Sequence, residues 1–139
     1  GATHAIDAHK ADPVQTVKDL TNGLLADMVV DVTGVGASVP LSIELVRPMG
    51  TVILGSNSGP KPISLVPDII ANKEIRYQGV YTQDAPAARA AIKLIESRRY
   101  PIEKMVTHRF PLEEAEKAVQ ITGGEIEMEG FIKGVIVPN

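Results

Sequence analysis

The stretch Ala26-Asp27-Met28-Val29-Val30-Asp31-Val32-Thr33-Gly34 decides the fold of this 139-residue chain, together with Gly50-Thr51-Val52-Ile53-Leu54-Gly55-Ser56-Asn57, which follows a short helical pattern. Both are apolar, β-branched runs that do not alternate with polar residues and that end in small residues. This is typical of parallel strands that are covered on both faces and end at a ligand crevice. Two such strands joined by a helix form a βαβ unit.

The rest of the chain alternates between helix and strand patterns. Asp12 is a candidate N-cap residue and Pro13 a first helical residue, which together predict a helix that ends at Gly23. Asp84 and Pro86 predict the start of another helix in the same way. Further helices are expected from Ser38 to Pro48, over Pro67–Asn72 and over Pro111–Ile121, and further strands at Thr3–Asp7, Glu74–Tyr81, Met105–Phe110 and Phe131–Val137. Strands that alternate with helices predict an α/β fold with a doubly wound parallel sheet.

Composition excludes several classes of function. The net charge of −3 gives no electrostatic reason to expect nucleic acid or an anionic membrane as a partner. No apolar run approaches the roughly 20 residues that a membrane span needs. With 0 Cys there is no disulfide and no thiolate metal site, so we expect a cytoplasmic protein.

Five passages together resemble the coenzyme-binding half of a medium-chain dehydrogenase/reductase, in the zinc alcohol dehydrogenase superfamily. The passages are Gly1-Ala2-Thr3-His4-Ala5-Ile6-Asp7, Asp31-Val32-Thr33-Gly34, Leu45-Val46-Arg47-Pro48-Met49-Gly50-Thr51-Val52, Thr107-His108-Arg109-Phe110-Pro111-Leu112-Glu113-Glu114-Ala115 and Ile132-Lys133-Gly134-Val135-Ile136-Val137-Pro138. The resemblance implies an incomplete Rossmann-like sheet that lacks its first two strands and continues into C-terminal helices and a final strand. Residues 1–84 would be the partial dinucleotide-binding domain. Residues 85–139 would return to a catalytic domain.

The same resemblance implies a coenzyme site at the carboxyl ends of the strands, which meet at one crevice in such sheets. Residues at the carboxyl end of Met28–Val32 would line the crevice, those at the end of Thr51–Gly55 would lie on the nicotinamide side, and those at the end of Glu74–Tyr81 would hold the carboxamide. Lys133 matches a basic residue near the coenzyme pyrophosphate. The expected cofactor-binding residues are Val32, Thr33, Gly34, Leu54, Gly55, Ser56, Val80, Tyr81, Thr82 and Lys133.

Other interpretations of individual residues remain open. Gly34-Val35-Gly36-Ala37-Ser38-Val39 has the outline of a phosphate-binding fingerprint, but Val39 replaces its final small residue and no carboxylate ends the next strand. Gly34 can also serve simply as a turn, and Lys133 as a surface lysine. Asp31 is expected in a turn or capping role, and His108 in a structural one. The three histidines, His4, His9 and His108, form no local metal pair, so no catalytic or metal-binding residue is expected in this chain.

The function implied by the resemblance is that of a C-terminal fragment of an NAD- or NADP-dependent alcohol dehydrogenase-like oxidoreductase. Any zinc would be held by the parent enzyme outside this chain, and the chain alone is expected to be inactive and to bind the dinucleotide weakly. The alternatives are a non-catalytic module that binds a nucleotide or a partner, and a fragment of a zinc-free quinone or enoyl reductase. A homo-oligomer is expected through the sheet edge at residues 74–81.

One expectation concerns the order of the strands. If Thr3–Asp7 is the third strand of a 3-2-1-4-5-6 sheet, the two strands that should separate it from Met28–Val32 are not in the chain. Unpaired backbone groups are costly where they are buried. We therefore expect Thr3–Asp7 to pair in parallel directly beside Met28–Val32, or a second copy of the chain to occupy that edge.

Overall fold

The computed structural model of the chain describes residues 2–138, which form two compact units. The first unit extends to Thr82 and the second begins at Gln83. Among the described residues, no helix is both long and apolar enough to cross a membrane.

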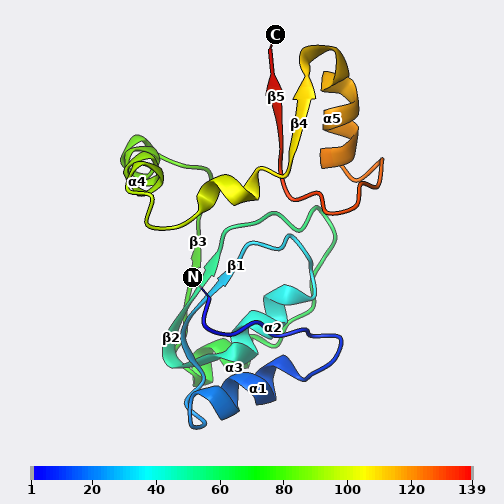
Figure 1. Cartoon of the computed structure of the whole chain (residues 1–139). Helices are drawn as coiled ribbons and strands as arrows, with labels where there is room; N and C mark the ends of the chain where they lie inside the picture. The colour runs from blue at the N-terminus through cyan, green and yellow to red at the C-terminus, as the bar shows by residue number, and fades with distance from the viewer. Residues whose placement is uncertain (1, 139) are drawn as a thin grey trace. The chain divides into compact units, whose positions relative to one another are not determined.

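A three-stranded parallel sheet forms the centre of the first unit (Figure 1). Its strands are β1 (Ala26–Asp31), β2 (Val46–Leu54) and β3 (Arg76–Gly79), in the order β1-β2-β3. Asp31 is in register with Leu54, and Leu54 with Gly79, so the carboxyl ends of all three strands are level. The parallel α/β arrangement expected from the sequence is confirmed.

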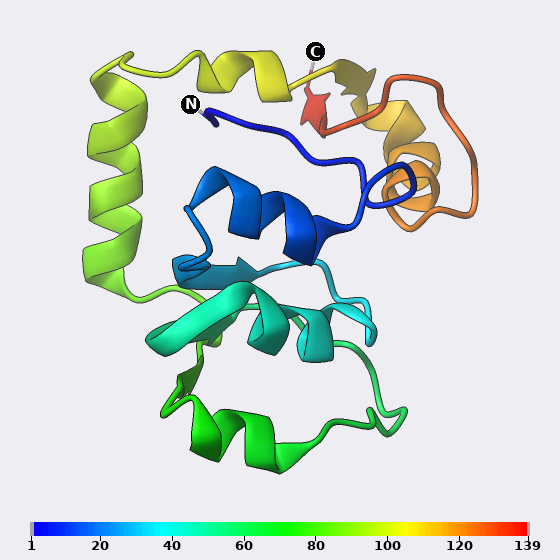
Figure 2. The same cartoon turned by 90° about the horizontal axis from the view of Figure 1, so that it is seen from below.

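Three short helices belong to the same unit: α1 (Pro13–Leu20), α2 (Ser38–Leu45) and α3 (Pro67–Asn72). The predicted start of α1 is confirmed, because Asp12 Oδ1 accepts hydrogen bonds from the backbone N–H groups of Val14 (2.8 Å) and Gln15 (3.2 Å). Pro67 opens α3 as predicted. Figure 2 shows α2, in cyan, between α1 in blue and α3 in green.

The helices cover one face of the sheet and leave the other open. Ile43 of α2 packs with Val46 and Val52 of β2 and with Ile75, and partly buried Val29, Ile69, Ile70 and Tyr77 surround this core. Side chains alternate across a strand, so Met28 and Val30, the neighbours of Val29, lie on the opposite face. They are 57% and 56% exposed. The sheet is therefore covered by helices on one face only.

Of the two alternatives expected for the edge of β1, pairing with Thr3–Asp7 is wrong, and occupation by a second copy of the chain stays a prediction. This segment forms no strand, and β1 is hydrogen-bonded to β2 alone. A strand is stabilised by backbone hydrogen bonds to a neighbouring strand. Thr3–Asp7 has no such neighbour, so it does not form a strand. The expectation assumed that β1 is buried, but Met28 and Val30 on its open face are exposed.

The end of α2 also differs from the expectation. The helix stops at Leu45 and β2 starts at Val46, before Pro48 and Gly50. Lys73, from the end of α3, donates hydrogen bonds through Nζ to the carbonyl oxygens of Ile43 (2.9 Å), Glu44 (3.1 Å) and Val46 (2.9 Å). These bonds satisfy the last carbonyls of α2, and this allows the chain to leave the helix before Pro48.

The second unit contains a smaller parallel sheet of β4 (His108–Pro111) and β5 (Gly134–Val137). Its helices are α4 (Ala85–Glu96), η1 (Ile102–Met105), η2 (Leu112–Glu114) and α5 (Ala115–Thr122). Asp84 caps α4 as predicted, by accepting a hydrogen bond from the Ala87 N–H (2.7 Å). Phe110, Ala118 and Ile121 form the core of this unit, with Met128 and Phe131 packed against them.

Candidate functional site

The carboxyl ends of the three strands in the first unit are joined by two hydrogen bonds beyond the strands themselves. The Gly55 N–H donates to the Asp31 carbonyl oxygen (2.8 Å), and the Val80 N–H donates to the Leu54 carbonyl oxygen (2.9 Å). The segments that follow β1, β2 and β3 therefore leave the sheet side by side.

Gly55 lies between two valines at this end of the sheet. A β-carbon at position 55 would be 3.3 Å from Val32 Cγ1 and 3.3 Å from Val80 Cγ2. Val32 is 68% exposed and Val80 is 51% exposed. Three of the residues expected from the sequence thus come together as an open apolar surface, which we call the strand-end patch: Val32, Gly55 and Val80.

The loops after β1 and β2 also meet near this patch. Gly34 has φ +71°, a conformation that suits glycine, and a β-carbon there would be 3.2 Å from the Asn57 carbonyl oxygen. A larger residue at position 34 would push the two loops apart. Gly34 therefore combines the turn role and the close approach that the sequence left as alternatives.

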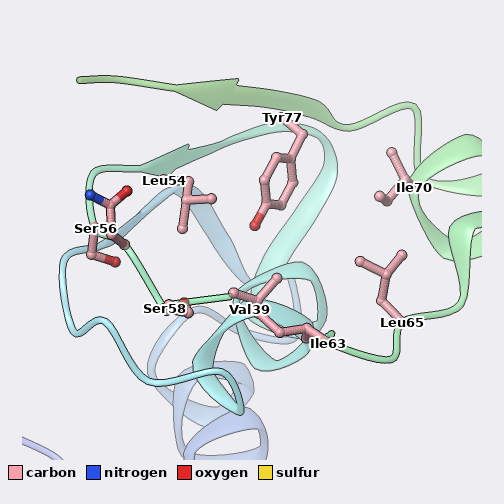
Figure 3. A pocket seen from close by; sticks show the side chains of 10 residues that line it. Val39, Leu54, Ser56, Ser58, Ile63, Leu65, Ile70 and Tyr77 are labelled. Atoms are coloured by element: carbon pink, nitrogen blue, oxygen red, sulfur yellow. The ribbon is translucent and has the colours of Figure 1, made fainter. Parts of the chain in front are cut away.

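Leu54 and Ser56 point to the other face of the sheet, because they flank Gly55 in an extended segment. They line a cavity of about 610 Å³ together with Val39 of α2, Ile63 of the following loop and Tyr77 of β3 (Figure 3). Ser56 Oγ and the Tyr77 hydroxyl are buried and have no hydrogen-bond partner among the described residues. The residues predicted at the end of β2 are thus divided between the strand-end patch and this cavity.

Tyr81 and Thr82 lie at the end of the first unit, and Lys133 lies in the second unit before β5. Tyr81 is 83% exposed, and Thr82, with φ +56°, closes the first unit. Lys133 belongs to the second unit and is exposed. Its backbone is held by Thr107, whose N–H donates to the Lys133 carbonyl oxygen (3.0 Å) and whose Oγ accepts a hydrogen bond from the Ile132 N–H (3.0 Å).

His108 has contacts that fit the structural role expected for it. Its ring lies 6.4 Å from the ring of Phe110 and 5.5 Å from the ring of Phe131, measured between centroids. Its Nδ1 is 2.9 Å from Thr107 Oγ.

Asp31 is a buried charged residue behind the strand-end patch, with 5% of its surface exposed. Its carboxylate accepts hydrogen bonds from the Thr33 N–H (3.0 Å), Thr33 Oγ (2.8 Å) and Ser38 Oγ (2.5 Å). Burial alone would raise the pKa of Asp31, but the hydrogen bonds from Ser38 and Thr33 outweigh it and hold the pKa of this carboxyl below its usual value. The sequence predicted a turn or capping role, but the size of this network depends on Ser38, seven residues away.

The residues that the structure describes form no zinc site. The sequence has no cysteine, and among residues 2–138 no group of three or more His, Asp or Glu side chains is placed to hold a metal ion. The patch and the cavity offer apolar side chains, hydroxyls and backbone groups instead. Such a lining is typical of sites for small organic molecules.

Comparison with known proteins gives one consistent family. Residues 1–97 match the sequence model of the family described as zinc-binding dehydrogenase. A protein of Mycobacterium tuberculosis named as a probable alcohol dehydrogenase is 39% identical over 143 residues, which cover 99% of this chain and 38% of that protein.

Two solved structures are similar over nearly the whole chain. An alcohol dehydrogenase from Thermotoga maritima superposes with a TM-score of 0.89 at 21% identity, over 100% of this chain and 38% of that structure. A zinc-binding dehydrogenase from Sinorhizobium meliloti, determined with bound NADP, superposes with a TM-score of 0.84 at 26% identity, over 99% of this chain and 40% of that structure. The chain therefore spans about two fifths of the length of these relatives.

Proposed function

Because this chain belongs to the zinc-binding dehydrogenase family, we propose that it forms part of the coenzyme site of an NAD- or NADP-dependent, alcohol dehydrogenase-like oxidoreductase. The observation that carries the proposal is the strand-end patch, where Val32, Gly55 and Val80 meet at the level carboxyl ends of three parallel strands. A ligand crevice is expected at this place in an open parallel sheet. The NADP bound to the similar Sinorhizobium meliloti structure supports the same ligand class.

The residues of the patch would bind and orient the nicotinamide ring. Gly55 presents no side chain, so a flat ring can approach the backbone between Val32 and Val80. The two valines are exposed in the free chain, and a bound ring would cover them and exclude water. When bound, the coenzyme supplies the hydride chemistry, and the protein supplies binding and orientation.

The segment after β3 would hold the carboxamide of the ring. The Val80 N–H is already bonded to the Leu54 carbonyl oxygen, so it is not free for a ligand. We propose that a backbone carbonyl of Val80 or Tyr81 accepts from the carboxamide NH₂ instead. Lys133 would contact the pyrophosphate as a point charge.

We propose that the isolated chain does not oxidise alcohols and binds NADH only at about millimolar concentration. Backbone N–H groups at a helix N-terminus supply most pyrophosphate contacts in dinucleotide sites of this type. Within residues 2–138, no helix is preceded by a complete glycine fingerprint. The nearest candidate, residues 34–39 at the start of α2, has Val39 at its last position, and Val39 is buried in the core at 6% exposure.

An NMR titration of the ¹⁵N-labelled chain with NADH tests this proposal. The amide signals of Gly34, Gly55 and Val80 should shift together with a Kd of about 1 mM or weaker. Gly50, in the middle of β2 and four residues before its carboxyl end, should not shift and is the internal control. The absence of shifts at the strand-end patch would contradict the coenzyme site, whereas a micromolar Kd or turnover of an alcohol by the pure chain would contradict the proposed inactivity.

We also propose that the sheet edge at residues 74–81, which includes β3, pairs with the same edge of a second copy of the chain. β3 ends the sheet order, so its outer side has no neighbouring strand in the described residues, and Arg76 is its charged residue. Because the Val80 N–H points inward to Leu54, the N–H of Tyr81 points away from β2.

Tyr81→Pro should therefore weaken the proposed dimer, whereas Val80→Pro would also break a bond inside the sheet. Sedimentation velocity should show a shift from dimer to monomer for Tyr81→Pro. Tyr81→Phe keeps the N–H and is the matched control. A wild-type chain that is monomeric at all concentrations, or a Tyr81→Pro variant that still dimerises, would remove this interface.

A further inference from the structure

The Asp31 carboxylate connects the end of β1 to the start of α2. Thr33 donates to it through both its N–H and its Oγ, and Ser38, the first residue of α2, donates through its Oγ. Thr33 Oγ is also 2.8 Å from Ser38 Oγ and accepts a hydrogen bond from the Val35 N–H (3.1 Å). The network closes around residues 31–38, and this is the segment that carries Val32 and Gly34 of the proposed coenzyme site.

The backbone of Asp31 connects the same segment to β2. Its carbonyl oxygen accepts the hydrogen bond from the Gly55 N–H (2.8 Å). The side chain and the main chain of one residue thus position the two loops that meet at Gly34 and Asn57, where the gap leaves no room for a β-carbon without strain.

A carboxylate suits this position better than a neutral side chain. Three donors converge on it, and the two oxygens of an ionised carboxyl accept all three without offering a proton in return. Hydrogen bonds to a charged acceptor are shorter and stronger than neutral ones, in line with the 2.5 Å contact from Ser38. With 5% of its surface exposed, Asp31 does not present its carboxylate to a ligand at the patch.

We propose that Asp31 is a positioning residue, which holds Val32 and Gly34 against Gly55 so that the coenzyme crevice is formed before the dinucleotide binds. The ligand in this inference rests on the function proposed above. The mechanism is preorganisation: a loop that is already in place does not have to be ordered at the cost of binding energy.

The experiment compares Asp31→Ala with Asp27→Ala in the ¹⁵N-labelled chain. Asp27 lies on the same strand, but its side chain is 88% exposed and pairs with Arg47 at the other end, so the control loses a carboxylate without touching the crevice. In the ligand-free chain, amide exchange at Thr33, Val35 and Gly55 should become about tenfold faster in Asp31→Ala and stay unchanged in Asp27→Ala. Exchange at Val52, in the core, should change much less.

An NADH titration of the same variants is the second part. The Kd should rise about fivefold in Asp31→Ala and stay unchanged in Asp27→Ala. Asp31→Asn keeps an acceptor oxygen for Thr33 and should recover most of the loss. This recovery distinguishes positioning by hydrogen bonds from a general effect of stability.

The outcomes separate this inference from the proposed function. If wild type shows no NADH shifts but Asp31→Ala still loosens residues 33–35 and 55, the coenzyme proposal fails and the positioning of the loop stands. Equal exchange and equal Kd in Asp31→Ala and wild type, or exchange that rises as much at Val52 as at Thr33, would overturn the inference. If Asp31→Ala does not fold, the same measurements are made on Ser38→Ala, which removes one donor to the Asp31 carboxylate. Unchanged amide exchange and unchanged Kd in Ser38→Ala would also overturn the inference.

Discussion

Lys73 offers the sharpest test of how the first unit is held together. Lys73→Met keeps the length of the side chain but removes the three hydrogen bonds from Nζ to the carbonyl oxygens of Ile43, Glu44 and Val46. A hydrogen bond to a charged group contributes about 1.5–3 kcal/mol, and a cation at a helix C-terminus adds about 0.3–1 kcal/mol. Removal of the partly buried ammonium also relieves its desolvation cost, which offsets part of this sum. We expect a net loss of about 2 kcal/mol in the free energy of unfolding.

The assay should report the first unit alone, since the chain has two units. Urea unfolding followed at the amide signals of Val52 and Ile75 meets this need, because both residues belong to the core beneath α2. Lys61→Met, which removes an exposed loop lysine, is the matched control and should change the free energy by less than about 0.5 kcal/mol. A loss below about 0.5 kcal/mol for Lys73→Met would refute the conclusion that Lys73 ends α2.

The pKa of Lys73 provides an independent check of the same contact. Burial lowers this pKa below its ordinary value of 10.5, the charge of Glu44 opposes the shift and that of Lys18 adds to it. Between the folded and the unfolded pKa the unfolded chain binds more protons, so the contribution of Lys73 to stability rises with pH in that window. The difference in unfolding free energy between wild type and Lys73→Met should therefore grow as the pH approaches 10.5.

Three further predictions concern single residues. Met49→Gly should raise the free energy of unfolding by about 0.5–1 kcal/mol, because Met49 has φ +60° and a side chain that is 70% exposed; a loss in urea unfolding would contradict this. Tyr77→Phe should raise it by about 1 kcal/mol, because the buried Tyr77 hydroxyl has no partner in the described part of the chain; marked destabilisation would mean that the hydroxyl is bonded. The hydrogen bonds to Asp31 hold its pKa below the ordinary value of 3.8, so its contribution to stability is present above 3.8 and is lost as the pH falls through the folded pKa; wild type should therefore lose more stability than Asp31→Asn as the pH falls below 3.8, and parallel losses would count against it.

The local features of this protein were determined by the sequence alone. Asp12 with Pro13, and Asp84 with Pro86, start helices as the sequence predicts. The cap bonds join residues only two or three apart, so they do not depend on distant parts of the chain. The apolar, β-branched runs before Val32 and Gly55 predicted parallel strands that end at one edge, and the strand-end patch lies there. These inferences needed only neighbours along the chain.

Tertiary structure decided what depends on distant partners. Thr3–Asp7 has the pattern of a strand but no strand to pair with, and α2 ends at Leu45 because the Lys73 ammonium reaches its carbonyls from about thirty residues away. At the end of β2, Gly55 lies on the patch and Leu54 faces the cavity, and this division follows from which face of the sheet the helices cover. A residue's sequence neighbours set its backbone preference, but only the packed sheet determines which of its groups find partners.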